Sequence, residues 1–164
     1  MSSQRISKQN DLYLVLHNVR SAHNVGSIFR TADAVGVKKI YLTGYTPTPV
    51  DRLGRSRNDV AKTALGSQNH VAWEHFERVG TLLDGLKRKN IKILALEQSK
   101  EAVDYKSVTV RHSSALVVGN EVRGLSSNIL SKVDLIIEIP MKGKKESLNV
   151  SVACGIALFR LCDV

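Results

Sequence analysis

"IEIPMKGKKESLNVSVACGIALFR" (residues 137–160) joins an apolar strand, a basic loop and an apolar helix. Pro140 ends the strand because it has no N–H to donate, and Gly143 permits a tight loop. We predict the helix over residues 147–160. Capping of the helix accounts for Ser147, but it does not account well for Asn149. The pattern therefore predicts a polar site where this helix starts.

Short apolar runs alternate with helix-period segments along the rest of the chain, which is typical of a mostly parallel sheet covered by helices. We predict an α/β fold of one domain, because 164 residues with 43% hydrophobic content support one core but not two. The expected strands cover residues 12–17, 38–44, 70–75, 91–97, 114–120 and 134–140. The expected helices cover residues 24–35, 59–65, 78–89, 126–133 and 147–160.

The charge balance predicts a polyanionic partner. The chain has 24 Lys and Arg against 15 Asp and Glu, a formal net charge of +9. Nucleic acid is the first candidate, and the alternative is a basic protein with no such partner.

The first ten residues lack the apolar centre of a signal peptide, and no apolar run is long enough to span a membrane. We expect a cytoplasmic protein with no membrane partner.

Metal binding is not indicated, because Cys154 and Cys162 lack the spacing of a zinc site and the five histidines are scattered. We expect both cysteines to be reduced thiols, buried or nearly so.

Residues 43–62 are expected to form a long surface loop, which holds two of the three prolines and Arg52, Arg55 and Arg57. Its basic character favours contact with RNA or DNA, and the alternative is a mobile solvated loop.

Two further stretches could carry chemistry. In "NVGSIFRTADAVGV" (residues 24–37), helical periodicity buries Val25 and Phe29 and places Asn24 and Arg30 on an adjacent face. The alternative is that Asn24 caps the helix and Arg30 is a solvated charge. Gly26 indicates that something approaches the backbone closely.

In "VVGNEVRGLS" (residues 117–126), a buried strand runs directly into Gly119, Asn120 and Glu121. Ligands of open α/β sheets bind beyond the carboxyl ends of the strands, so polar residues here favour a site. The alternative is a turn in which Asn120 and Glu121 cap the next helix.

From about Leu12 to the C-terminus, these stretches together with "IPMKGKKESLNVSVA" (residues 139–153) resemble the three motifs of the SpoU (TrmH-type) branch of the SPOUT RNA methyltransferases. The resemblance implies a Rossmann-like sheet with helices on both faces, a C-terminal deep trefoil knot and an obligate homodimer. It implies S-adenosylmethionine as methyl donor and an RNA ribose 2′-hydroxyl as acceptor. Larger relatives carry an extra RNA-binding domain, whereas residues 1–10 here are expected to be a flexible tail, so the catalytic dimer itself would choose the target. We expect RNA rather than DNA as the partner, with tRNA favoured over rRNA.

The resemblance also implies roles for individual residues. Catalytic roles would fall to Arg30, Asn24, Glu121, Ser147 and Asn149. The cofactor would contact Leu96, Gly119, Asn120, Ile139, Pro140, Met141, Ser147 and Leu148. RNA would contact Arg30, Arg52, Arg55, Arg57, Arg123, Lys142, Lys144 and Lys145. Arginine is an awkward base because its pKa exceeds about 12. We therefore expect Arg30 to stabilise developing negative charge, with a role as base left open.

Two other functions are compatible with the fold. One is a non-catalytic RNA-binding or ribosome-assembly factor, which the presence of all five catalytic matches disfavours. The other is a different nucleotide-binding enzyme, which would need a phosphate-cradling glycine loop that the sequence lacks.

Overall fold

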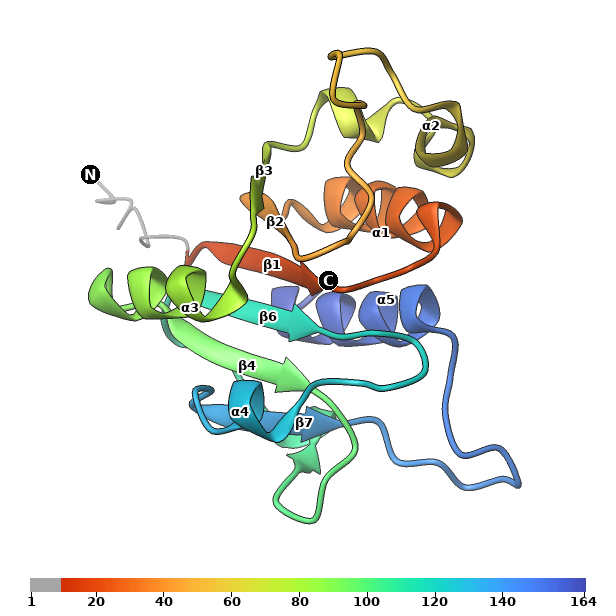
Figure 1. Ribbon diagram of the computed structural model, residues 1–164. Helices are drawn as coiled ribbons and strands as arrows, with labels where there is room; N and C mark the ends of the chain where they lie inside the picture. The colour runs from red at the N-terminus through yellow and green to blue at the C-terminus, as the bar shows by residue number, and fades with distance from the viewer. Residues whose placement is uncertain (1–9) are drawn as a thin grey trace, which may run out of the picture.

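The computed structural model describes residues 10–164, so nine residues of the expected tail lie outside the described part of the chain. Its framework is a sheet of seven parallel strands in the order β3-β2-β1-β6-β4-β7-β5 (Figure 1). The strands are β1 (Leu12–His17), β2 (Lys39–Thr43), β3 (Trp73–Phe76), β4 (Lys92–Leu96), β5 (Val103–Asp104), β6 (Ser114–Val118) and β7 (Leu135–Glu138). The predicted α/β class is confirmed.

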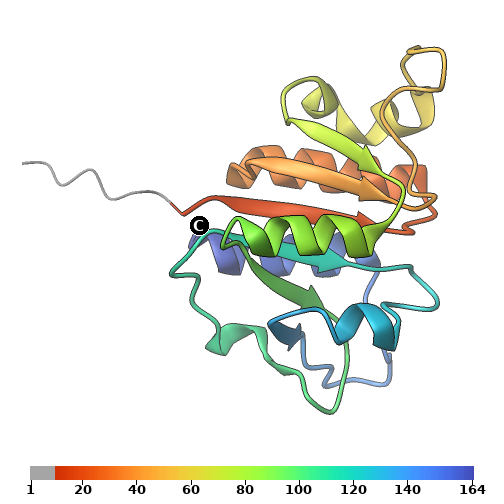
Figure 2. The same cartoon turned by 60° about the vertical axis from the view of Figure 1, so that its left-hand side comes forward.

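Helices cover both faces of the sheet, as Figures 1 and 2 show. The helices α1 (Ala22–Val35), α2 (Asn58–Ala64) and α5 (Val150–Cys162) lie on one face. The helices α3 (Val79–Arg88) and α4 (Ser127–Leu130) lie on the other. Two short 3₁₀ helices, η1 (Ser67–Asn69) and η2 (Tyr105–Ser107), complete the elements of the described residues. Because both faces are covered, the central strands are mostly apolar, and all five residues of β6 are buried.

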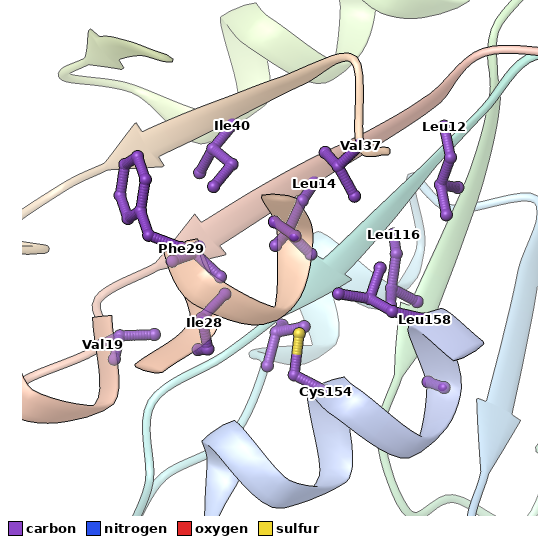
Figure 3. Close-up of a cluster of buried hydrophobic side chains, with 14 of the residues drawn as sticks. Leu12, Leu14, Val19, Ile28, Phe29, Val37, Ile40, Leu116, Cys154 and Leu158 are labelled. Carbon is purple, nitrogen blue, oxygen red and sulfur yellow. The ribbon is translucent and has the colours of Figure 1, made fainter. Parts of the chain in front are cut away.

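The larger core lies between the sheet and helices α1 and α5 (Figure 3). Phe29 of α1, Leu116 of β6 and Leu158 of α5 have no exposed surface there. Complete burial of side chains of this size contributes about 1.5–3 kcal/mol each. Cys154 lies in the same core, and burial raises the pKa of its thiol to about 12. Cys154 therefore stays a protonated, inert thiol at neutral pH. The second cysteine, Cys162, is also a free thiol and is half-buried.

The predicted elements are found, with differences at their ends. All six expected strands are present, and the missed strand β5 has only two residues, too few to give a pattern. Helix α1 begins at Ala22. Ser21 caps it, because the Ser21 hydroxyl oxygen accepts a hydrogen bond from the backbone N–H of Asn24 at 3.2 Å. The alternative that Asn24 is the cap is therefore wrong. Helix α5 begins at Val150 rather than Ser147.

Close approach at Gly26 is confirmed, and the approaching group is protein rather than ligand. A Cβ atom at Gly26 would collide with the Thr63 hydroxyl and the Val60 carbonyl of α2. The Thr63 hydroxyl also donates a hydrogen bond to the His23 carbonyl at 2.9 Å. Gly26 thus lets α2 pack directly on α1.

After β7, the chain runs through residues 139–149 and returns to the α1 face of the sheet as α5 (Figure 1). The threading of this segment into a trefoil knot stays a prediction from the family resemblance. Among residues 10–164, no helix has both the length and the apolarity to cross a membrane.

Phe29→Ala should lower the free energy of unfolding by about 3–5 kcal/mol, because it leaves a cavity in the larger core. The matched control is Asp33→Ala on the exposed side of the same helix, which should change it by no more than about 0.5 kcal/mol. Urea unfolding followed by circular dichroism measures both. Equal losses in the two variants would contradict this description of the core.

Candidate active site

The carboxyl ends of β4, β6 and β7 and the start of α5 enclose a cleft of about 530 Å³. This is the edge where open parallel sheets bind ligands. Seven of the eight residues predicted to contact a cofactor line it, and Pro140 does not. The seven are Leu96, Gly119, Asn120, Ile139, Met141, Ser147 and Leu148.

A chain of side-chain hydrogen bonds beside the cleft joins three segments that are distant in the sequence. The Asn24 amide nitrogen donates to Glu121 Oε1 at 3.2 Å, and Asn24 Oδ1 accepts from the Asn149 amide nitrogen at 3.2 Å. Glu121 and Asn149 line the cleft, and Asn24 lies between them in the first turn of α1. These bonds join three of the five residues predicted to be catalytic, and a fourth, Ser147, lines the same cleft.

Glu121 is also anchored to the backbone that leads into α1. Its Oε2 accepts from Arg20 N at 3.0 Å, and its Oε1 accepts from Ser21 N at 3.1 Å. Partial burial raises the pKa of Glu121, but the hydrogen bonds from Arg20, Ser21 and Asn24 outweigh it. The net result is a pKa below the ordinary glutamate value, so Glu121 is a carboxylate at neutral pH.

Asn149, not Ser147, is the N-cap of α5. Asn149 Oδ1 accepts from Ser151 N at 2.9 Å and from the Ser151 hydroxyl at 2.6 Å. The prediction that capping accounts for Ser147 and not for Asn149 is therefore wrong in both parts, because the helix starts three residues later than expected, at Val150. Ser147 instead lies exposed on the cleft wall.

Asn120 closes the turn that presents Glu121. Its Oδ1 accepts from Val122 N at 2.9 Å and from Arg123 N at 2.8 Å. The helix that follows is capped by Ser126, so the alternative that Asn120 and Glu121 cap α4 is wrong. Gly119 is required by the packing of this turn, because a Cβ atom there would lie 2.8 Å from the carbonyl carbon of Gly124.

Glu97 and Gln98, which follow β4, are cleft residues that the sequence did not single out. Glu97 Oε2 accepts from Leu125 N at 2.8 Å, and Gln98 Nε2 donates to the Glu146 carbonyl at 2.6 Å. The pair therefore ties the loop after β6 and the loop after β7 to the end of β4. Their position directly after an apolar strand was the one available signal.

The charge of the cleft lining identifies the kind of ligand it suits. Four carboxylates line it and no lysine or arginine does; the carboxylates are Glu97, Glu121, Glu138 and Glu146. Leucine, isoleucine and valine side chains provide apolar walls. Such a lining favours a ligand with apolar surface and positive charge, and it opposes phosphate groups. Among residues 10–164, no group of His, Cys, Asp and Glu side chains is arranged to hold a metal ion.

Arg30 is exposed on α1 and is not among the residues that line the cleft. It follows Asn24 by six residues, which places it about 9 Å further along the helix axis and about 120° around it. Within one chain, the structure therefore does not bring Arg30 to the cleft.

Apart from Arg30 in α1, the residues predicted to bind RNA lie in loops and turns. In residues 44–57, Asp51 Oδ2 accepts from Arg55 Nε at 2.8 Å, and Arg57 pairs with Asp59 at 2.6 Å. An isolated bridge from Val50 to Ser56 closes this loop. The others are exposed, with Arg52 in the same loop, Arg123 in the turn after β6, and Lys142, Lys144 and Lys145 in the loop after β7.

The all-parallel sheet with a ligand cleft at its carboxyl edge makes this an α/β protein of Rossmann-like class. Residues 11–159 match the model of the SpoU rRNA Methylase family, and the chain belongs to this family. It is 38% identical over 156 residues to a tRNA (guanosine(18)-2′-O)-methyltransferase of Aquifex aeolicus, covering 93% of this chain and 69% of that protein. It is 34% identical over 152 residues to the Escherichia coli K12 enzyme of the same name, covering 93% of this chain and 63% of that protein.

Solved structures agree with this assignment. The A. aeolicus TrmH/SpoU tRNA modifying enzyme superposes with a TM-score of 0.82 at 35% identity, covering 94% of this chain and 75% of that one. An AdoMet-bound rRNA methyltransferase from Sinorhizobium meliloti superposes with a TM-score of 0.80 at 26% identity, covering 93% and 56%.

The lowered pKa of Glu121 predicts how its contribution to stability depends on pH. A carboxylate whose pKa is depressed on folding stabilises the protein above the ordinary glutamate value of about 4.3, and this stabilisation is lost as pH falls through the folded-state pKa. Glu121→Gln should lower the free energy of unfolding by about 1 kcal/mol at pH 7. The difference from wild type should shrink below pH 4.

Urea unfolding between pH 3 and pH 7 measures this difference, with Glu101→Gln on an exposed turn as the matched control. A Glu121→Gln deficit that stays constant over the whole pH range would rule out the assigned carboxylate interactions.

Proposed function

We propose that this protein is an S-adenosylmethionine-dependent RNA methyltransferase that transfers a methyl group to a ribose 2′-hydroxyl, with tRNA as the favoured substrate. The observation that carries the proposal is the hydrogen-bonded chain Glu121–Asn24–Asn149 beside a cleft lined by carboxylates and apolar strand ends. The similarity to two tRNA 2′-O-methyltransferases at 38% and 34% identity supports both the reaction and the substrate. An rRNA substrate is the second candidate, because the S. meliloti relative is described as an rRNA methyltransferase.

The residues present fit S-adenosylmethionine. Leu96, Ile139 and Leu148 would pack against the adenosine, and the cleft carboxylates suit the positive charges of the sulfonium and the amino group. When bound, S-adenosylmethionine supplies a methyl group on a positively charged sulfur. Ser147 and Asn149 would hold this ligand from the start of α5, and Asn149 would link it through Asn24 to Glu121.

The acceptor hydroxyl must lose its proton as it attacks, so a nearby positive charge lowers the barrier by stabilising the developing alkoxide. We assign this role to Arg30. Because Arg30 does not line the cleft of its own chain, the proposal requires Arg30 to reach the cleft of a partner subunit.

The surface of α5 and α1 supports a homodimer that would meet this requirement. Val152 and Phe159 of α5 are 50% and 42% exposed, and they lie in a groove with Ser27 and Thr31 of α1. Arg30 is adjacent to Thr31 on the same helix. A second copy packed on this groove would bury its apolar surface and bring Arg30 to the interface.

We further propose that residues 10–164 form one methyltransferase domain that acts in the cytoplasm, where its RNA substrate would be found. The single continuous sheet supports one domain. Lys142, Lys144 and Lys145 lie exposed in the loop between β7 and α5, and Arg123 lies in the turn that presents Glu121. These positions suit contacts with RNA phosphates around the cleft.

Arg30→Ala should lower the rate of methyl transfer by at least about a hundredfold, because it removes the charge that stabilises the alkoxide. The affinity for S-adenosylmethionine should change little, because the residues proposed to hold it, Leu96, Ile139 and Leu148 among them, are unaltered in this variant. Transfer of radiolabelled methyl groups to unfractionated tRNA measures the rate, and calorimetry measures the affinity. Arg88→Ala, at the exposed end of α3, is the control. Unchanged turnover in Arg30→Ala would remove this residue from the mechanism.

Val152→Glu should convert the dimer to a monomer, because a carboxylate in the apolar groove would be buried without a partner. Methyl transfer should fall with it, since each cleft would lose the Arg30 of the other subunit. Light scattering measures the mass in solution, and Thr81→Glu on the exposed surface of α3 is the control. A wild-type monomer with full activity would contradict the two-chain site.

A further inference from the structure

Tyr45 is the most exposed aromatic side chain in the described part of the protein, at 58%. It follows Gly44 directly after β2, and because the strands are parallel the end of β2 lies at the same edge of the sheet as the cleft. The other aromatic residues of residues 10–164 are buried or half-buried except Phe159, which lies in the α1–α5 groove. The proposed dimer would cover Phe159, and it offers no explanation for Tyr45.

Both ends of Tyr45 are fixed by hydrogen bonds. Its backbone N–H donates to Asn18 Oδ1 at 3.1 Å, and its hydroxyl accepts from Asn120 Nδ2 at 3.0 Å. Gly44 adopts a positive φ of 63° with its Cα against the Asn18 amide, where a side chain would collide. The ring is therefore held in one orientation while much of its surface stays in solvent. A side chain ordered in advance loses little conformational entropy on binding.

The residue that holds the Tyr45 hydroxyl also shapes the active-site turn. Asn120 lines the cleft, and its Oδ1 fixes the turn that presents Glu121 and Arg123. Asn120 Nδ2 also donates to the Asn18 carbonyl at 3.0 Å, so the end of β1 belongs to the same network. Tyr45 itself does not line the cleft. The ring thus lies next to the proposed reaction centre, outside the space for the cofactor.

We propose that Tyr45 is a stacking platform for a base of the RNA substrate, at the methylated nucleotide or the one beside it. This inference rests on the proposed function. Transfer to a ribose hydroxyl leaves the base with no part in the reaction, yet the sugar must be held still at the cleft. A base of a single-stranded loop is unstacked and free to lie on an aromatic face, and such stacking tolerates any base. Phosphate contacts by the basic loops would supply most of the affinity, while stacking on Tyr45 would hold the sugar of the bound nucleotide still at the cleft.

Tyr45→Leu should weaken binding of unfractionated tRNA between about fivefold and about a hundredfold, because it removes the aromatic face and keeps an apolar side chain. Tyr45→Phe is the matched control, since it keeps the face and loses only the hydroxyl bond to Asn120, and it should weaken binding by no more than about threefold. Filter binding without S-adenosylmethionine measures both. Equal losses in the two variants, or no loss in Tyr45→Leu, would overturn the proposal.

Ultraviolet cross-linking of the wild-type protein to the same tRNA gives a test that does not depend on a variant folding. Mass spectrometry should find a nucleotide adduct on the peptide that contains Tyr45, and adducts only on other peptides would overturn the proposal. If the wild-type protein binds no S-adenosylmethionine, the proposed function is refuted. If the wild-type protein methylates tRNA and the Tyr45→Leu variant binds tRNA as tightly as the wild type does, only the stacking role is refuted.

Discussion

The hydrogen bonds of Asn24 to Glu121 and to Asn149 are the interactions on which the site depends. Each partner also fixes a segment of backbone: Glu121 accepts hydrogen bonds from the residues ahead of α1, and Asn149 caps α5. The three residues come from segments up to 125 positions apart in the chain. Loss of the Asn24 amide would leave a carboxylate and a helix cap with no link between them.

This arrangement follows from the sheet. Parallel strands buried on both faces direct all their carboxyl ends to one edge, where the loops after β4, β6 and β7 must meet. Glu97 and Gln98 then connect these loops to each other through backbone groups. The cleft carries carboxylates while the surrounding loops carry lysines and arginines, although the chain has a formal net charge of +9. This separation of charge suits a cationic cofactor inside and a polyanionic substrate outside.

The strands and the three motif segments could be predicted from the sequence because apolar runs and polar residues at their ends are local signals. Helix starts were less predictable: Ser21 rather than Asn24 caps α1, and Asn149 rather than Ser147 caps α5, since several residues near each start can serve as caps. For Glu97 and Tyr45, the position shortly after an apolar strand is the one local signal, and it does not reveal their hydrogen bonds. Their partners are Leu125 and Asn120, which lie 28 and 75 positions away and are brought close only by the strand order. Arg30 was expected at the cleft, and a single chain does not place it there.

Equilibrium dialysis of the wild-type protein against radiolabelled S-adenosylmethionine and ATP shows which charge the cleft selects, because the two ligands share adenosine and differ in the charge of their tails. An acidic, partly apolar cleft should bind S-adenosylmethionine saturably in the micromolar range and leave ATP unbound. Tight binding of ATP with none of S-adenosylmethionine would show that this edge of the sheet serves a different chemistry.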